Sequence, residues 1–344
     1  MNKKKYKIAI IGATGAVGLE IIKLLEKRNF PILSIDFFAS KNSVGKKLIF
    51  NSREIKVKLL TRESGKGIDI AIFSAGTKIA KQFIPIFIKE NSFVIDNSNA
   101  WRMDKNIPLV VPEVNEYVLN KNKKLIANPN CSTIQMVLVL KPLHDFASIK
   151  RIVVSTYQSV SGAGQRGINE LIKQTKIWLK NKNICITEFD KFKYQIAFNL
   201  IPQIDIFTKN GYTKEEMKIK NETRKILNDD SIGISATCVR VPVFRSHSES
   251  IWIETKKVIS LSKVKELLAR TNGVCLLDDP KNEKYPMPIF SENKEVTYVG
   301  RIRSDISINS NRAFVLWVVS DNLLKGAALN AVQIAETLIK RKYV

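Results

Sequence analysis

Hydrophobic and polar positions in the first part of the chain alternate between short apolar runs and a helical spacing. The β-rich runs predict strands at residues 6–11, 32–38, 68–73, 93–95, 109–111 and 125–127. Between the first two runs, apolar residues recur with helical spacing from Val17 to Leu25 and predict a helix over 16–27. Strands that alternate with helices are typical of parallel α/β folds, so we expect a doubly wound, Rossmann-type domain over residues 1–129.

The pattern changes after Pro129. Longer β-rich runs predict strands at 151–157, 233–243, 250–255 and 312–319, separated by helical patterns at 131–143, 170–179, 214–227 and 263–270. Long strands separated by helices indicate an α+β domain, here over 130–321, whose sheet packs against a partner. The amphipathic pattern at 324–340 predicts a last helix that returns to the first domain, so we expect residues 322–344 to complete it.

Length and composition agree with two globular domains. At 344 residues the chain exceeds the roughly 250–300 residues at which one hydrophobic core stops growing. The 44% hydrophobic and 26% charged residues exclude the disordered and membrane-spanning classes. The start is basic and then apolar, as in a secretory signal, but its apolar stretch is short and runs into a glycine-rich turn. We therefore expect a cytoplasmic protein.

The charge balance raises a second class of function. Lys and Arg number 56 against 32 Asp and Glu, a net charge of +24, which favours association with polyanions. The basic residues are scattered, and no segment interleaves them with aromatic residues as a nucleic-acid stacking surface does. This distribution predicts a lysine-rich solvated surface, with no specific nucleic-acid partner and no membrane partner.

A glycine-rich loop follows the first predicted strand and opens the first helix. Its sequence is GATGAVG at 12–18. Gly12 allows a tight turn, and Gly15 lets the backbone approach a pyrophosphate, which the helix N-terminus attracts. This context predicts a dinucleotide site. The end of the second strand reads Ala-Ser-Lys-Asn-Ser at 39–43, with no carboxylate to repel a 2′-phosphate, which favours NADP over NAD.

Cys131 is the candidate nucleophile. It lies in NPNCST (128–133), where a proline-marked loop gives way to an apolar helix, and a helix N-terminus stabilises a thiolate. The remaining cysteines, Cys185, Cys238 and Cys275, lie in β-rich or polar runs and are predicted to fill space in the interior. Wide cysteine spacing and only two histidines predict no metal site.

A reactive thiol beside a nicotinamide implies one chemistry. A thiolate adds to an aldehyde, and the resulting thiohemiacetal expels hydride to the nicotinamide and leaves a thioester. Water or phosphate then takes the acyl group.

Several segments together resemble the aspartate-β-semialdehyde dehydrogenase family. They occur in order over nearly the whole chain: GATGAVG (12–18), DNSNAWR (96–102), VPEVN (111–115), NPNCST (128–133), QSVSGAG (158–164), EEMK (215–218), RVPVFRSHSE (240–249) and DNLLKGAA (321–328).

The resemblance assigns roles by position. It implies that Cys131 accepts the acyl group, that His247 is the acid/base residue, and that Gln158 orients the substrate and the acyl intermediate. It places the substrate α-carboxylate on Arg240 and the α-ammonium on Glu215. Because Arg240 and His247 are an odd number of residues apart, the chain between them must bend for both to face one pocket.

The phosphate and cofactor sites follow in the same way. The family's phosphate-binding positions are matched by Arg102, Lys218 and Asn130. Its NADP(H) contacts are matched by Thr14, Gly15, Ala16, Val17, Ser40, Ser43, Ser161, Gly162 and Asn322. The chain departs from the family at Asn42, where an arginine that reaches the 2′-phosphate is common, so Lys41 or Ser43 must compensate for tight NADP binding.

The resemblance implies NADPH-dependent reduction of L-aspartyl-4-phosphate to L-aspartate 4-semialdehyde, in lysine, threonine, methionine and diaminopimelate biosynthesis, by a homodimer or homotetramer. One alternative is an N-acetyl-glutamyl-phosphate reductase, whose nucleophile context differs and whose acylated amine has no use for Glu215. Another is a catalytically silent, basic polyanion-binding protein, against which Cys131, Gln158 and His247 argue together.

Overall fold

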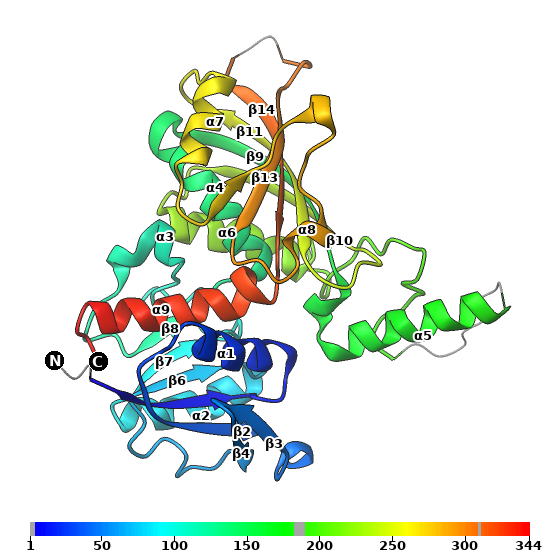
Figure 1. Cartoon of the computed structure of the whole chain (residues 1–344). Helices are drawn as coiled ribbons and strands as arrows, with labels where there is room; N and C mark the ends of the chain where they lie inside the picture. Colours follow the sequence, from blue (N-terminus) through cyan, green and yellow to red (C-terminus); the bar gives the residue numbers. More distant parts are fainter. Residues whose placement is uncertain (1–3, 182–189, 309–310) are drawn as a thin grey trace. The chain divides into compact units, whose positions relative to one another are not determined.

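The computed structural model describes residues 4–181, 190–308 and 311–344 of the chain. These residues form two units, one of residues 4–130 and 327–344 and the other of the described residues between 131 and 326 (Figure 1). The first unit therefore consists of two separate stretches of chain, and the second is inserted between them. Each unit is described below by itself.

A six-stranded parallel sheet forms the centre of the first unit, in the order β5-β2-β1-β6-β7-β8. Its strands are β1 (Tyr6–Ile11), β2 (Ile32–Ala39), β5 (Lys58–Leu59), β6 (Ile70–Phe73), β7 (Phe93–Asp96) and β8 (Leu125–Ala127), and a separate hairpin pairs β3 (Lys47–Phe50) with β4 (Arg53–Lys56). The strand order reverses beside β1, and this reversal is where open α/β sheets bind their ligands.

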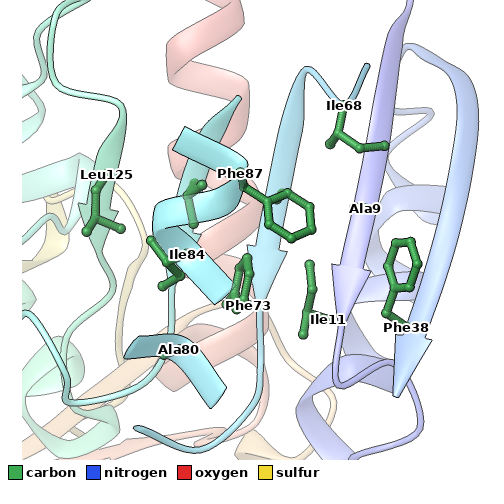
Figure 2. Packing of buried hydrophobic residues seen from close by; sticks show 11 residues of the cluster. Ala9, Ile11, Phe38, Ile68, Phe73, Ala80, Ile84, Phe87 and Leu125 are labelled. Atoms are coloured by element: carbon green, nitrogen blue, oxygen red, sulfur yellow. The ribbon is translucent and has the colours of Figure 1, made fainter. Parts of the chain in front are cut away.

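One face of this sheet is covered by α2 (Thr77–Lys89). Ala80, Ile84 and Phe87 of α2 pack against buried side chains of the sheet, among them Ile11 and Phe73 (Figure 2). The rings of Phe73 and Phe87 meet edge to face, with their centroids 5.2 Å apart. This apolar layer holds the strands whose carboxyl ends carry the cofactor loop.

The first unit is completed by α1 (Ala16–Lys27) and α9 (Leu329–Lys340). Arg28, which ends α1, forms an ion pair with Glu336 of α9 at 2.8 Å. The buried Asn330 of α9 donates to the carbonyl oxygen of Val110 and to the side chain of Asn128. These contacts fix the last helix to the first unit.

The predicted strand at 109–111 is wrong. Leu109 forms a single isolated bridge to Ala127, and this bridge does not extend into a ladder. The side chain of Asn115 instead accepts the N–H of Val111 at 2.9 Å and donates to the Leu109 carbonyl. Because Pro112 starts the short helix α3 (Pro112–Asn115), the chain turns away before a strand can extend.

The second unit contains a six-stranded mixed sheet in the order β10-β9-β11-β14-β13-β12. Its strands are β9 (Ile149–Gln158), β10 (Gly233–Arg240), β11 (His247–Thr255), β12 (Val274–Leu276), β13 (Thr297–Ser304) and β14 (Ala313–Ser320). Helices α4 (Cys131–Ala147), α6 (Lys214–Leu227) and α7 (Leu261–Ala269) pack on this sheet, with α4 over its central strands. A further helix, α5 (Gln165–Asn181), extends to one side (Figure 1).

The two faces of this sheet differ in burial. Side chains that alternate toward the helices, such as Val154, Ile251 and Leu316, are buried. The opposite face carries half-exposed aromatic residues, and Tyr157 and Trp317 lie there with ring centroids 5.4 Å apart. No helix among the described residues is long and apolar enough to cross a membrane.

Candidate active site

Three of the predicted site residues stand at one end of the second unit's sheet. Gln158 is the last residue of β9, Arg240 is the last of β10, and His247 is the first of the antiparallel β11. Arg240 and Gln158 are register partners, so their side chains point to the same face. Residues 241–246 make the bend that the sequence required, with Ser246 in the left-handed region at φ 74°.

Cys131 is the first residue of α4, so its thiol lies where the helix dipole and the N–H groups favour a thiolate. A single π-helical turn, η5 (Leu324–Ala328), passes close to it. A Cβ placed on Gly326 would lie 2.9 Å from the Cβ of Cys131. Only glycine permits this approach of the chain to the predicted nucleophile.

Gln158 connects the nucleophile's helix to the predicted ammonium site. Its amide nitrogen donates to the hydroxyl of Ser132 on α4, and to Glu215 of α6 at 3.2 Å. Glu215 also accepts from Lys218 at 2.9 Å, and Lys218 reaches Asp205 at 3.0 Å. Burial disfavours the Lys218 charge, but the two carboxylates outweigh it and raise the pKa of Lys218.

His247 is held as a neutral ring. It is fully buried, and its Nδ1 accepts the backbone N–H of Ser159 at 3.1 Å. Burial first, and then the charge of Arg240, lower the pKa of His247 to about 3, against the opposing effects of Glu215 and the Ser246 backbone. With Nδ1 occupied as an acceptor, the proton of the neutral ring is on Nε2. Nε2 has no partner among the described residues.

Arg240 has hydrogen-bonding capacity left for an anion. Its Nη1 donates to the carbonyl of Ser159 at 2.7 Å, and this is the one hydrogen bond of the guanidinium within the described ranges. Burial lowers the pKa of Arg240, yet a guanidinium stays charged. A largely buried guanidinium whose Nε and Nη2 are unused can bind a carboxylate through two parallel hydrogen bonds.

Gly162 lies directly against this pair. A Cβ there would stand 2.8 Å from Nη1 of Arg240 and 3.1 Å from Nε2 of His247. We expect Gly162→Ala to lower kcat/KM by about tenfold or more, because misplacing a reacting group by about an ångström costs that much. Steady-state assays check this, with Gly76→Ala as the control, since nothing lies within 4 Å of a Cβ at Gly76. Equal kcat/KM values for Gly162→Ala and Gly76→Ala would contradict the prediction.

The glycine loop of the first unit fits a dinucleotide. Gly12 has φ +82°, and a Cβ there would lie 2.4 Å from the carbonyl oxygen of Ser74. A Cβ on Gly18 would lie 2.2 Å from the Gly12 carbonyl, so only glycine lets α1 pack this closely. Gly15 is the N-cap of α1, and no side chain of the described residues caps that turn. Its N–H groups are thus directed toward the position of a pyrophosphate.

The other predicted cofactor residues fall in two groups, one in each unit. In the first unit, the hydroxyl of Thr14 donates to Ser43 at 3.2 Å, and Ser40 precedes the exposed turn η1 (Lys41–Ser43) that carries Asn42. In the second unit, Ser161 donates to Asn322 at 3.1 Å. Ala16 and Val17 are the first two residues of α1.

The predicted phosphate-binding residues are also divided between the units. Arg102 and Asn130 are buried in the first unit, where Arg102 donates to the Asn97 carbonyl at 2.8 Å. Lys218 belongs to the second unit, so the grouping of the three around one phosphate stays a prediction.

Three residues that shape the site were not singled out from the sequence. They are Ser132, Ser159 and Gly326, and all three lie inside segments whose resemblance had been noted. Their roles depend on contacts with residues far along the chain, which spacing does not reveal. Of the other cysteines, Cys238 is buried with its pKa raised by burial, Cys275 is half-buried, and Cys185 lies outside the described residues.

Comparison with known proteins decides the family. Residues 7–122 match the family model "Semialdehyde dehydrogenase, NAD binding domain", and residues 140–325 match "Semialdehyde dehydrogenase, dimerisation domain". An aspartate-semialdehyde dehydrogenase of Aquifex aeolicus is 54% identical over 338 residues, which cover 97% of this chain and 98% of the relative. The chain belongs to the aspartate-semialdehyde dehydrogenase family.

Solved structures agree with this assignment. Aspartate semialdehyde dehydrogenase II of Vibrio cholerae, in complex with ASA, has a TM-score of 0.94 and 45% identity, covering 98% of this chain and 99% of that one. The enzyme of Candida albicans with NADP has a TM-score of 0.77 and 25% identity, covering 99% and 100%. The expected fold class, a Rossmann-type domain with an α+β domain, is confirmed. The chain is thus an oxidoreductase with a nicotinamide-binding domain and a dimerisation domain.

Proposed function

We propose that this dehydrogenase reduces L-aspartyl-4-phosphate to L-aspartate 4-semialdehyde and phosphate, with NADPH, through a thioester on Cys131. One observation carries the proposal: the helix that begins at Cys131, the neutral His247 and the unsaturated guanidinium of Arg240 adjoin one sheet end. The family and its relatives support the same reaction.

Each side chain has a separate task in the proposed reaction. Arg240 binds the substrate α-carboxylate through Nε and Nη2. Glu215, which already accepts two donors, binds the α-ammonium. Gln158 holds the substrate between the Ser132 end of α4 and Glu215. Arg102, Lys218 and Asn130 bind the phosphate that leaves.

The chemistry centres on Cys131 and the substrate carbonyl. The Cys131 thiolate attacks the acyl carbon, the C–O bond to phosphate breaks, and a thioester remains. A nicotinamide cofactor held by the glycine loop would supply the hydride that reduces the thioester. When the C–S bond then breaks, the thiolate re-forms and the aldehyde is released.

His247 donates a hydrogen bond from Nε2 to the carbonyl oxygen as negative charge develops there, and backbone N–H groups at the start of α4 donate to the same oxygen. Proton transfer by His247, which the resemblance implies, would require a proton on Nδ1, and the Ser159 N–H opposes it.

A direct assay tests the reaction. Purified protein is mixed with aspartate semialdehyde, phosphate and NADP, and absorbance of the reduced nicotinamide is followed. We expect reduction that depends on phosphate, and acyl phosphate as the product. Failure to reduce NADP under any of these conditions would overturn the proposed function. N-acetylglutamate semialdehyde as the substrate tests the alternative reductase activity.

The cofactor's 2′-phosphate is predicted to be held by the turn at 39–43. Ser40, Lys41 and Ser43 offer hydroxyls and a cation there, and Asn42 is uncharged. We expect Asn42→Arg to raise the ratio of kcat/KM for NADP over NAD, because a guanidinium binds phosphate through paired hydrogen bonds. Asn42→Gln controls for side-chain length. Unchanged ratios in Asn42→Arg would place residue 42 away from the 2′-phosphate.

The dimerisation domain indicates assembly with a second copy of the chain. The open face of the second unit's sheet, with Val153, Tyr157, Trp252 and Trp317, is the proposed contact, because its half-exposed aromatic residues favour burial. Light scattering distinguishes a homodimer from a homotetramer.

Two further expectations stay predictions: a cytoplasmic location, and a place in lysine, threonine, methionine and diaminopimelate biosynthesis.

A further inference from the structure

Asp321 is a fully buried carboxylate that the proposed reaction does not use. It directly follows the last residue of β14. Its Oδ1 accepts the backbone N–H of Leu323 at 2.9 Å and that of Leu324 at 3.1 Å. Its Oδ2 accepts Nε of Arg245 at 2.8 Å and the backbone N–H of Asn293 at 2.7 Å. A carboxylate has about four acceptor positions, so both oxygens are fully used.

On one side, Asp321 holds the turn that lies against the predicted nucleophile. Leu324 begins the π-helical turn η5, and Oδ1 satisfies N–H groups at this start. The backbone carbonyl of Asp321 also accepts the N–H of Gly326 at 3.1 Å. Gly326 is the residue at which a Cβ would lie 2.9 Å from the Cβ of Cys131. The side chain and the main chain of Asp321 therefore both fix the backbone beside the thiol.

On the other side, Asp321 and its neighbour hold the bend that ends at His247. Arg245 and Ser246 are the last two residues of this bend. Arg245 pairs with Asp321, and the N–H of Ser246 donates to Oδ1 of Asn322 at 2.9 Å. Ser246 has φ 74°, a conformation that costs free energy for a residue with a side chain, so contacts from outside the bend stabilise it. His247 follows directly.

We propose that Asp321 is a positioning residue, which holds the turn beside Cys131 and the bend ahead of His247 in a fixed relation. It touches no reacting atom. Arg245 supplies the positive charge that compensates the buried carboxylate and makes this hydrogen bond stronger than a neutral one. The consequence for turnover rests on the proposed function, whereas the hold on the turn does not.

Two variants separate the two sides. Asp321→Asn keeps the shape but replaces one acceptor oxygen with a donor NH₂ group. The remaining oxygen is expected to stay with the charged Arg245, because that hydrogen bond is the stronger one, so the turn loses its acceptor. Arg245→Met instead releases the bend and leaves the carboxylate to hold the turn. Both variants are expected to lower the urea midpoint, because a buried group loses its partner.

Alkylation of the Cys131 thiol by iodoacetamide reports on the turn without any turnover. The rate is followed from the mass of the peptide that contains Cys131. A loosened turn uncovers the thiol, so Asp321→Asn is expected to react about threefold faster than the wild type, or more. Arg245→Met is expected to react at the wild-type rate. An Asp321→Asn protein that reacts no faster than the wild type would overturn the proposal.

Kinetics report on the catalytic geometry. Displacing either segment misplaces a reacting group, so both variants are expected to lower kcat about tenfold. The KM for aspartate semialdehyde is expected to change much less, because Arg240 and Glu215, which bind the substrate, are unchanged. Wild-type kcat in Arg245→Met would overturn the hold on the bend.

The matched control is Asp278→Asn. Asp278 is a second buried carboxylate of the same unit, with a side chain that is 2% exposed, and it pairs with Lys265 of α7 at 2.8 Å. It also accepts the backbone N–H of Ile302 on β13 at 3.3 Å. Its variant is expected to lower the urea midpoint while the alkylation rate and kcat stay near the wild-type values. Equal changes of both rates in Asp278→Asn and Asp321→Asn would show a general loss of stability and overturn the positioning role.

The outcomes distinguish this inference from the proposed function. If the wild type reduced no NADP, the proposed function would fail, whereas the alkylation rates would still decide whether Asp321 holds the turn beside Cys131.

Discussion

Cys131→Ala is expected to lower phosphate-dependent reduction of NADP at least about 10⁴-fold, because removing a covalent nucleophile leaves only binding and oxyanion stabilisation. The position of Cys131 at the first residue of α4 makes its thiolate the attacking group. The measurement compares kcat of the two proteins at saturating aspartate semialdehyde. A trapped thioester, detected by mass after mixing with substrate, is expected in the wild type and not in the variant.

Two controls separate a lost nucleophile from a damaged fold. Cys238→Ala changes a buried thiol of β10, whose pKa burial raises, and is expected to leave kcat within a few-fold. Binding of NADP to Cys131→Ala, measured by fluorescence, is expected to match the wild type, because the glycine loop lies in the other unit. Turnover near the wild-type rate in Cys131→Ala would reject the thioester mechanism.

His247→Asn is expected to lower kcat by about 10²–10³-fold, the usual cost of losing an oxyanion donor, with a much smaller change in KM. Nε2 of His247 acts on the oxygen that gains charge in the transition state, whereas Arg240 and Glu215 bind the substrate in its ground state. The ring's placement depends on the N–H of Ser159, which Nδ1 accepts at 3.1 Å. A variant with wild-type kcat and raised KM would reverse this assignment and make His247 a binding residue.

The same variant has a second readout in the pH dependence of stability. The pKa of His247 is about 3 in the folded protein against 6.5 for an ordinary histidine. Below pH about 6.5 the histidine therefore binds a proton in the unfolded chain but stays neutral in the folded protein. The free energy of unfolding consequently decreases as the pH falls from about 6.5 toward 3. The loss is about 1.4 kcal/mol per pH unit. We expect His247→Asn to be less sensitive to acid in urea unfolding at pH 7, 6 and 5.

Local sequence patterns predicted correctly those helices and strands whose ends are marked by turn or capping residues. Helix α1 and strands β1 and β8 have the predicted bounds, as does α6, whose Thr213 capping box marks its start. Helix α2 received no prediction, and Pro85 interrupts its pattern. Strand β13 also received none. Its register shifts between Gly300 and Arg303, and this irregularity breaks the alternation that predicts a strand.

The site residues likewise fall into those that local sequence patterns predict and those that depend on long-range contacts. Motifs identified Cys131 and His247, because a nucleophile at a helix start and a family segment are both local. The contact of Gly326 with Cys131 and the hydrogen bond from Gln135 to the His247 carbonyl join residues more than a hundred positions apart. Such contacts exist only after folding, so spacing along the chain does not reveal them.

The split composition of the first unit has a consequence for the order in which the protein forms. Helix α9, which the ion pair of Arg28 with Glu336 secures to α1, is synthesised after the whole of the second unit. If residues 131–326 were unfolded, α9 could pack on α1 only by closing a long loop, which costs conformational entropy. In the folded second unit, however, Gly326 touches Cys131, so the entry and exit of the inserted chain lie together. Folding of the inserted unit thereby brings the ends of this loop together, and the cofactor-binding unit closes its core last.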